Sequence, residues 1–335
     1  MLPLKIKQRT EAEQLKHAFA AGMAELTMPI PQSLTRDLIA EIMPTIPHLK
    51  EVANNLTLYL KDDYVMTHFQ GIGRLYEAQG FYIEAEDWYN QCLTISQKRF
   101  GLKHLHVANS LYNLAYLYYI NGRYNQAEHF QLQALEMRKE ILGCIDLDVA
   151  DSLNDLALIY RINERYKEAE SLLINALKIY LNLLGNKHRH IGTTLNNLAL
   201  IYYYKKLYKR AEILWKKSLK IRKRLLGNNH LDVGETLHNL GVLYRVQKRY
   251  EESKYFLQEA LQIRQNMRFD DHPDIAQSLN SLANLYREQG CYSQAKPLYQ
   301  KAIDIYEQRL GVEHPKTVKV RENFKILYTG ILNKK

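Results

Sequence analysis

The sequence predicts an all-α protein, a solenoid in which pairs of helices are stacked one on the next. Three observations support this fold class. The 335 residues include only fifteen Gly and eight Pro, with long runs that contain neither, and this composition favours helices. Hydrophobic residues make up 46% of the chain, enough for a substantial core. The decisive observation is an internal repeat with a period of 42 residues.

Four sets of residues recur at this constant step, two of Tyr and two of small residues. They are Tyr76, Tyr118, Tyr160, Tyr202, Tyr244, Tyr286 and Tyr328; Tyr82, Tyr124, Tyr166, Tyr208, Tyr250 and Tyr292; Ala85, Ala127, Ala169, Ala211, Ser253 and Ala295; and Cys92, Ala134, Ala176, Ser218, Ala260 and Ala302. Four such sets do not arise by chance, so each 42-residue unit is one structural repeat.

Each repeat is expected to form two helices joined by a short polar turn, because apolar residues follow a helical spacing on both sides of the turn. A small residue of the first helix marks the place where the second helix crosses closely. These residues are Gly73, Ala115, Ala157, Ala199, Gly241 and Ala283. A Leu-Gly pair ends the second helix, at 142–143, 184–185, 226–227 and 310–311. We expect its Gly to take the left-handed cap conformation.

The small-residue, Tyr and Ala spacing resembles the tetratricopeptide repeat, and the long unit with LNNLAxLY resembles its kinesin light chain type. The resemblance implies a right-handed superhelical α-solenoid whose first helices line a concave groove. Six repeats fit residues 62–313, and a capping helix follows within 314–335. The repeats span 62–103, 104–145, 146–187, 188–229, 230–271 and 272–313.

Residues 1–61 form a separate helical segment that is interrupted by prolines, including the PIP sequence at 29–31. Within it, SLTRDLIAEIMPTIPHLKEVANNLTLYL resembles the segment that precedes such repeats in bacterial signalling NTPases of the NB-ARC kind. The resemblance implies that the chain is the regulatory or sensor end of such a protein. The sequence contains no GxxxxGK phosphate loop.

Composition predicts a cytoplasmic protein. No apolar run reaches the roughly 18 residues that span a bilayer, and the N-terminal residues lack a signal-peptide pattern. The three cysteines are scattered, and we expect Cys92 to be a small buried residue. The net charge of +10 is concentrated in residues 186–226, which hold twelve Lys and Arg against the single Glu212.

Neither a metal site nor an enzyme is predicted. A His recurs before the first helix of four repeats and before the capping helix, as His104, His188, His230, His272 and His314, and Asp146 replaces it in the repeat at 146–187. Successive repeats lie roughly 10 Å apart, whereas zinc ligands converge within about 2 Å of one ion. We therefore expect these residues to have a loop or helix-capping role. The sequence lacks GxSxG, HExxH and phosphate-loop motifs, so we expect no catalysis and no cofactor.

The positions that vary between repeats predict the binding site. Helix periodicity places three rows on the side of the first helices that faces away from the second helices. The predicted peptide-binding residues are Tyr112, Asn154, Asn196, His238 and Asn280 in one row; Tyr116, Leu158, Leu200, Val242 and Asn284 in the next; and Tyr119, Arg161, Tyr203, Arg245 and Arg287 in the third. Asn, Tyr and Arg can bind an extended backbone or a carboxylate. For the neighbouring Asn113, Asn197 and Asn239 we favour a role between repeats.

The preferred function is a scaffold that binds an extended peptide or unstructured segment of a protein partner, which the Arg residues suggest is acidic. One alternative is contact with an ATPase module of the NB-ARC kind. Another is binding of nucleic acid or an acidic surface by the basic face at 205–224, although Trp215 there is in register with core positions. Self-association also remains open.

Overall fold

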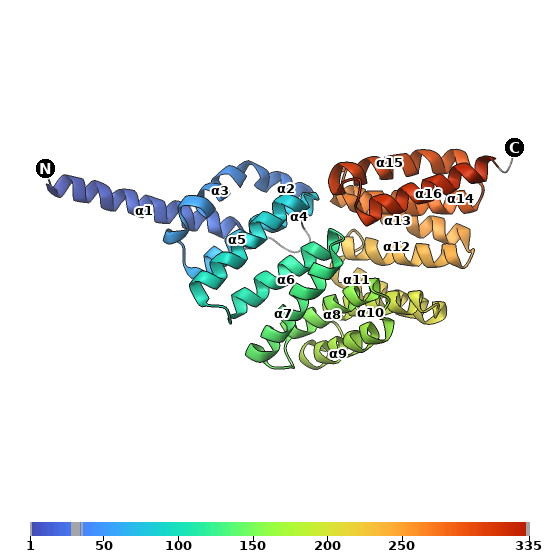
Figure 1. The fold of residues 1–335 in the computed structure, drawn as a ribbon, viewed down its shortest axis with the longest axis horizontal. Helices are drawn as coiled ribbons and strands as arrows, with labels where there is room; N and C mark the ends of the chain where they lie inside the picture. The colour runs from blue at the N-terminus through green and yellow to red at the C-terminus, as the bar shows by residue number, and fades with distance from the viewer. Residues whose placement is uncertain (1, 28–33, 35, 333–335) are drawn as a thin grey trace. The chain divides into compact units, whose positions relative to one another are not determined.

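The computed structural model describes residues 2–27, 34 and 36–332, which are helical and contain no strand. The all-α prediction is confirmed. The chain divides into two compact units, residues 1–114 and 115–335, and each is described by itself. The helices are α1 (Leu2–Thr27), α2 (Arg36–Ile42), α3 (Ile46–Asn55), α4 (Asp62–Gln79), α5 (Tyr82–Phe100), α6 (Leu105–Ile120), α7 (Tyr124–Leu142), α8 (Leu147–Ile162), α9 (Tyr166–Leu184), α10 (Arg189–Tyr204), α11 (Tyr208–Leu226), α12 (Leu231–Val246), α13 (Tyr250–Met267), α14 (Pro273–Glu288), α15 (Tyr292–Leu310) and α16 (Pro315–Leu332) (Figure 1).

The first unit packs α1 and α3 against α4, and α4 against α5. Two short 3₁₀ turns, Met43–Thr45 and Thr57–Tyr59, connect the early helices. Buried Cys92 lies 3.4 Å from the Ser110 hydroxyl, so the prediction that it is a small buried residue is confirmed. The PIP sequence at 29–31, residues 33 and 35 of the NB-ARC-like stretch, and the side chain of Tyr328 lie outside the described residues.

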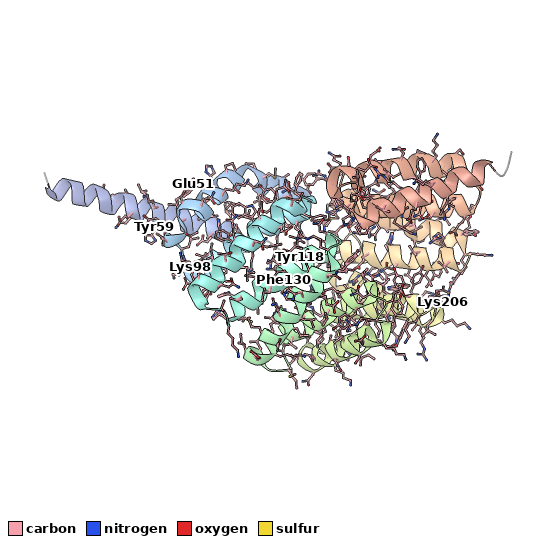
Figure 2. All side chains as sticks on the ribbon, viewed as in Figure 1. Glu51, Tyr59, Lys98, Tyr118, Phe130 and Lys206 are labelled. Carbon is pink, nitrogen blue, oxygen red and sulfur yellow. The ribbon has the colours of Figure 1, made fainter. Side chains whose placement is uncertain are left out.

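The second unit is a series of helix pairs, α8 with α9, α10 with α11, α12 with α13 and α14 with α15, followed by α16. The recurring Tyr residues pack between the two helices of a repeat. Tyr118 on α6 and Phe130 on α7, for example, have ring centroids 5.4 Å apart (Figure 2). No helix within the described parts of the chain is long and apolar enough to cross a membrane.

The small residue of each first helix allows close packing, as predicted. A Cβ built on Gly241 would lie 2.7 Å from the Leu257 side chain of α13, and one on Gly73 would lie 2.4 Å from the Tyr89 ring. Distances this short require the facing side chain to shift or the second helix to move away. At the corresponding position of α16, Lys325 is exposed. Among the described helices, α16 packs on α15 and α14 and has no second helix of its own, so a polar residue is suitable there.

The glycines that end the second helices differ from the prediction in one angle. Gly143 has φ 83° and ψ 177°, and Gly227 has φ 81° and ψ 175°. The expected positive φ is therefore confirmed, but the left-handed helical conformation is wrong. The Gly143 N–H still bonds to the Lys139 carbonyl oxygen at 3.0 Å, and the chain then turns directly into an extended loop. This combination of angles is accessible essentially to Gly alone.

The recurring histidines are helix N-caps, as predicted. The Nδ1 atom of His272 accepts a hydrogen bond of 3.1 Å from the Asp274 backbone N–H at the start of α14. His104, His188, His230 and His314 make the same bond to the residue two positions later. Asp146 replaces the imidazole with a carboxylate, which accepts from the Asp148 N–H at 2.8 Å. Nδ1 can accept only in the neutral ring, so Nε2 carries the hydrogen.

Candidate functional site

The first helices of the second unit form one layer. Successive first helices contact one another: α8 contacts α10, α10 contacts α12, α12 contacts α14 and α14 contacts α16. The turn after α6 lies against the start of α16, which shows that the layer is curved (Figure 1). A Cβ built on Gly122 in that turn would lie 2.9 Å from the Pro315 side chain and 3.1 Å from Nε2 of His314. We call this contact the clasp.

The first predicted row lies inside the layer and links successive repeats. Nδ2 of Asn197 donates to Oδ1 of Asn154, and Nδ2 of Asn239 donates to Oδ1 of Asn196, both at 3.2 Å. Asn323 makes the same bond to Asn280. Asn197 and Asn239 therefore do act between repeats, but they donate to side chains rather than to backbone groups. Asn154 and Asn196 are buried, and a contact of this row with a ligand stays a prediction.

His238 continues this row with an imidazole. Its Nε2 lies 3.4 Å from the Ser281 hydroxyl of the next repeat, and its buried Nδ1 makes no hydrogen bond to any described residue. Burial lowers the pKa of His238 well below its usual value, and nearby Arg264 and Arg245 lower it further. The ring is therefore neutral near pH 7.

The second predicted row is more accessible. Tyr116 is 41% exposed, and Leu158 is half-buried beside it on α8. Both line a small hollow together with Tyr119 and Asp155. Leu200 and Val242 are half-buried and also contact the apolar core of their repeats. The last member, Asn284, accepts a hydrogen bond of 2.7 Å from the Tyr299 hydroxyl, which fixes its orientation.

Arg161 is the centre of the third row. Its Nη2 donates to the Tyr119 hydroxyl at 3.0 Å, and its guanidinium lies 5.1 Å from the Tyr204 ring centroid. Burial alone would lower the pKa of Arg161, but Tyr119 and Tyr204 outweigh it and the net shift is upward. The buried Nε–H has no hydrogen-bond partner among the described residues. Arg161 therefore remains a cation with a free donor.

The other members of the third row are engaged differently. Arg245 forms an ion pair with Glu288 of the next repeat, and Arg287 makes a long hydrogen bond of 3.4 Å to the Asn323 carbonyl oxygen. Tyr203 packs edge-on against Tyr204, with ring centroids 5.4 Å apart. The structure thus brings Tyr119, Arg161 and Tyr203 around Tyr204. Tyr112, half-buried on α6, belongs to the first unit and is not placed relative to this cluster.

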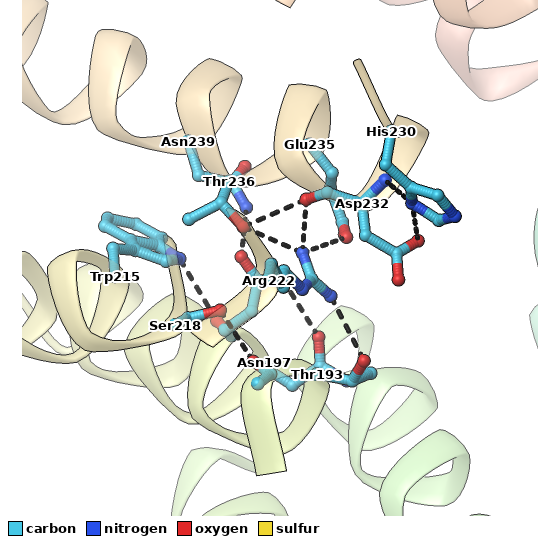
Figure 3. Close-up of polar contacts among 12 residues, drawn as sticks. Thr193, Asn197, Trp215, Ser218, Arg222, His230, Asp232, Glu235, Thr236 and Asn239 are labelled. Atoms are coloured by element: carbon cyan, nitrogen blue, oxygen red, sulfur yellow. Dashed lines mark hydrogen bonds and ion pairs between the residues drawn. The ribbon is translucent and has the colours of Figure 1, made fainter. Parts of the chain in front are cut away.

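Sequence reasoning missed a set of buried arginines on the second helices. Arg222 on α11 is 2% exposed, and its Nη1 donates to the Asp232 carbonyl oxygen at 2.7 Å and the Thr236 hydroxyl at 2.8 Å (Figure 3). Arg138 and Arg264 make equivalent bonds to α8 and α14. Each one fastens the first turn of the following repeat. Their 42-residue step was a usable signal, but Tyr at positions 180 and 306 interrupts it.

The basic face lies on α11. Trp215 is buried and donates from Nε1 to the Asn196 carbonyl oxygen at 3.1 Å, so the prediction that it packs in the core is confirmed. Lys216 pairs with Glu212 at 2.7 Å. Five other cations of α11 are exposed and form no ion pair with another described residue; they are Lys209, Lys217, Lys220, Lys223 and Arg224. Arg210, which is also exposed, lies 5.9 Å from the Tyr202 ring centroid. Lys206 also projects outward, from the turn before α11 (Figure 2).

No group of three His, Cys, Asp or Glu residues in the described parts of the chain could hold a metal ion. The site is a surface of tyrosines, apolar side chains and two arginines, Arg161 and Arg245, whose buried Nε–H groups have no hydrogen-bond partner among the described residues. Such a surface offers stacking, apolar contact and charged hydrogen bonds, all of which suit binding of a polypeptide.

Comparison with known sequences identifies the repeat. The sequence model of the tetratricopeptide repeat matches residues 64–140, 148–214, 190–266, 240–308 and 274–333. The prediction of kinesin light chain-like tetratricopeptide repeats is confirmed. No curated protein matches the chain.

Three solved structures have a similar fold. BtubC (BKLC) from P. vanneervenii is 24% identical over 70% of this chain and 94% of that chain, with a TM-score of 0.51. NprR in complex with its cognate peptide NprX is 16% identical over 86% and 85%, with a TM-score of 0.62. A Rap protein complexed with Competence and Sporulation Factor is 15% identical over 90% and 85%, with a TM-score of 0.59. At these identities the likeness is one of fold.

Proposed function

Because the chain belongs to the tetratricopeptide repeat family, we propose that it is a non-enzymatic scaffold that binds an extended peptide segment of a protein partner along its first helices. The observation that carries this proposal is the arrangement around Tyr116, Leu158 and Arg161. An exposed ring, a half-buried apolar side chain and a half-buried cation that forms no ion pair with another described residue lie within two neighbouring first helices. An extended peptide presents the complementary groups, which are apolar side chains, carbonyl oxygens and carboxylates.

Two further considerations support a peptide ligand. NprR and the Rap protein, which share the fold, are each seen with a bound peptide or factor. In this chain, the third row contains Arg161 and Arg287, neither of which forms an ion pair with another described residue. Arg245 is already paired with Glu288. We therefore expect the preferred peptides to carry a carboxylate near α8 or α14.

A selection experiment tests the proposal. The full chain is immobilised and used to select peptides from a displayed library of random sequences, and the affinity of each selected peptide is measured by fluorescence polarisation. Leu158→Ser should weaken binding about tenfold, since burying one Leu side chain contributes about 1.5–3 kcal/mol. Leu181→Ser is the matched control, because Leu181 is 43% exposed on the second helix of the same repeat.

Two results would contradict the proposal. One is that no peptide is enriched over a library selected on an unrelated protein. The other is that Leu158→Ser and Leu181→Ser weaken the selected peptides equally. Circular dichroism of both variants shows whether the helices are retained.

The basic face of α11 supports a second candidate function, binding of a polyanion. Five exposed cations there have no ion pair with another described residue, and Glu212 is the one acidic residue of α11. Binding of this kind releases counterions, so its affinity should fall steeply with salt. Reversing Lys217, Lys220 and Lys223 to Glu should abolish binding of a fluorescent single-stranded DNA at low salt. An unchanged affinity would remove this candidate.

A further inference from the structure

A crevice on the other side of the second unit is separate from the predicted groove. Its lining residues come from the second helices α7 and α9, from the loop at 143–146 and from the start of α8. Its volume is about 500 Å³, within the range of ligand-binding pockets, about 300–1,000 Å³. Val149 and Leu153 of α8 form its floor, and Ile179 of α9 contributes to the wall.

The loop that closes this crevice departs from the repeat. Ile145 is apolar and 64% exposed. In the other five repeats the corresponding residue is charged or polar: Lys103, Lys187, Asn229, Asp271 and Glu313. A polar residue at this exposed loop position is therefore compatible with the scaffold in every other repeat. At this exposure most of the Ile145 side chain is available for contact with a partner at the surface.

The rim of the crevice is positively charged. Lys139 of α7 and Lys178 of α9 line it and are exposed, and neither forms an ion pair with any residue that the structure describes. Asn175 and Asn182 of α9 also line it and offer amide donors and acceptors. The crevice thus combines an apolar floor, two uncompensated cations and two amides that can bond a peptide backbone.

We propose that this crevice binds a partner-protein segment in which apolar side chains are flanked by acidic residues. The apolar side chains fill the space beside Ile145 and Ile179, and the flanking carboxylates pair with Lys139 and Lys178. The charge of the rim selects an acidic segment over a basic one, because the cations of a basic segment would be repelled by Lys139 and Lys178. The proposal does not depend on the groove of the first helices, so the chain can hold two segments at once.

Cys144 supplies a direct readout, because it lines the crevice and is exposed. Cys291, equally a free and exposed thiol, lies on another repeat outside the crevice and is an internal control. The probes are three synthetic nine-residue peptides with a central Leu-Ile pair flanked by Glu, Gln or Lys. Alkylation of each thiol by iodoacetamide in the full chain is followed by mass spectrometry.

The Glu peptide should slow alkylation of Cys144 about tenfold at a concentration of about ten times its Kd, and the Lys peptide should not. Cys291 should react at an unchanged rate. Ile145→Asn, which introduces the residue found at 229, should weaken this protection without loss of helix. Combined Lys139→Glu and Lys178→Glu should weaken it about tenfold. Lys220→Glu, at the position of Lys178 in the next repeat, should leave it unchanged.

The proposal is overturned if the Glu and Lys peptides protect Cys144 equally, if neither protects it, or if the Lys139 and Lys178 reversals have no effect. It is also overturned if Cys144 is protected by raising the protein concentration alone, because a second copy of the chain is then the occupant. Leu158→Ser keeps the two sites distinguishable, since it should weaken peptides selected on the groove and leave protection of Cys144 intact.

Discussion

His272→Asn should make the protein more resistant to acid. The Nδ1 atom of His272 caps α14, and its ring is only 3% exposed. Burial lowers its pKa to about 3; Asp274 opposes this shift, while Arg268, Arg264 and Lys316 reinforce it. Protonation would both place a charge in this buried site and remove the lone pair that accepts the Asp274 N–H. Asn retains a cap acceptor at every pH.

The magnitude follows from the difference between the folded and unfolded pKa. A His with a pKa of about 3 in the folded chain and 6.5 in the unfolded chain binds protons preferentially when unfolded. Its contribution to stability is complete above pH 6.5 and is lost as the pH falls. At pH 5 the loss is about 2 kcal/mol. His314, whose pKa burial lowers to about 4, should lose a similar amount.

Urea unfolding followed by far-UV circular dichroism at pH 7 and pH 5 measures this effect. His272→Asn should leave the free energy of unfolding nearly unchanged at pH 7 and raise it by about 2 kcal/mol over the wild type at pH 5. His129→Asn, an exposed His within α7 that caps no helix, should change neither value. The reasoning fails if His272→Asn loses as much stability between the two pH values as the wild type does.

Three further predictions concern packing. Gly241→Ala should lower the urea midpoint, with a loss of about 1–3 kcal/mol in the free energy of unfolding, because the added Cβ would lie 2.7 Å from the Leu257 side chain. Gly22→Ala is the control and should not lower it, because a Cβ there has no atom within 4 Å. Gly122→Lys should open the clasp and raise the radius of gyration measured by small-angle X-ray scattering. The backbone tolerates Lys at this position, since Lys206 adopts φ 61° at the same turn position of another repeat. Glu164→Lys, at the same turn position, is the matched control and should leave the radius of gyration unchanged. Arg264→Met should speed deuterium exchange in the first turn of α14 at least tenfold, because each lost hydrogen bond from a charged donor contributes about 1.5–3 kcal/mol to stability. An unchanged exchange rate would show that these hydrogen bonds do not hold α14 in place.

The sequence predicts the packing residues because each repeat imposes the same local requirement. A small side chain is needed wherever two helices cross closely, and Gly241 and Ala283 meet that requirement one repeat apart. The N-cap histidines are predictable for the same reason, since one side chain satisfies one backbone group two residues away. For the glycines that end the second helices, the sequence predicted the sign of φ but not the value of ψ. Their positive φ depends on the missing Cβ, whereas their ψ depends on where the following loop must go.

The contacts between repeats are harder to predict, because they depend on two side chains whose separation is set by the stacking of whole helices. Asn197 and Asn154 are 43 residues apart, one more than the period, so a comparison of equivalent positions cannot pair them. The clasp is even harder to predict from the sequence. Gly122 and Pro315 meet only because small rotations accumulate over several repeats, and no single repeat determines their sum.

Variation between repeats therefore needs a second criterion before it can indicate a binding site. Tyr180 replaces the buried arginine found at Arg138 and Arg222, yet it still bridges repeats, because its ring stacks on His190 at 4.8 Å and its hydroxyl bonds Asp151. That substitution changes the chemistry and keeps the structural role, and its side chain is buried. Ile145 and Tyr116 vary where the side chain is exposed at the surface. A departure from the repeat that reaches the surface has no structural requirement to explain it, and it is there that we expect partners to bind.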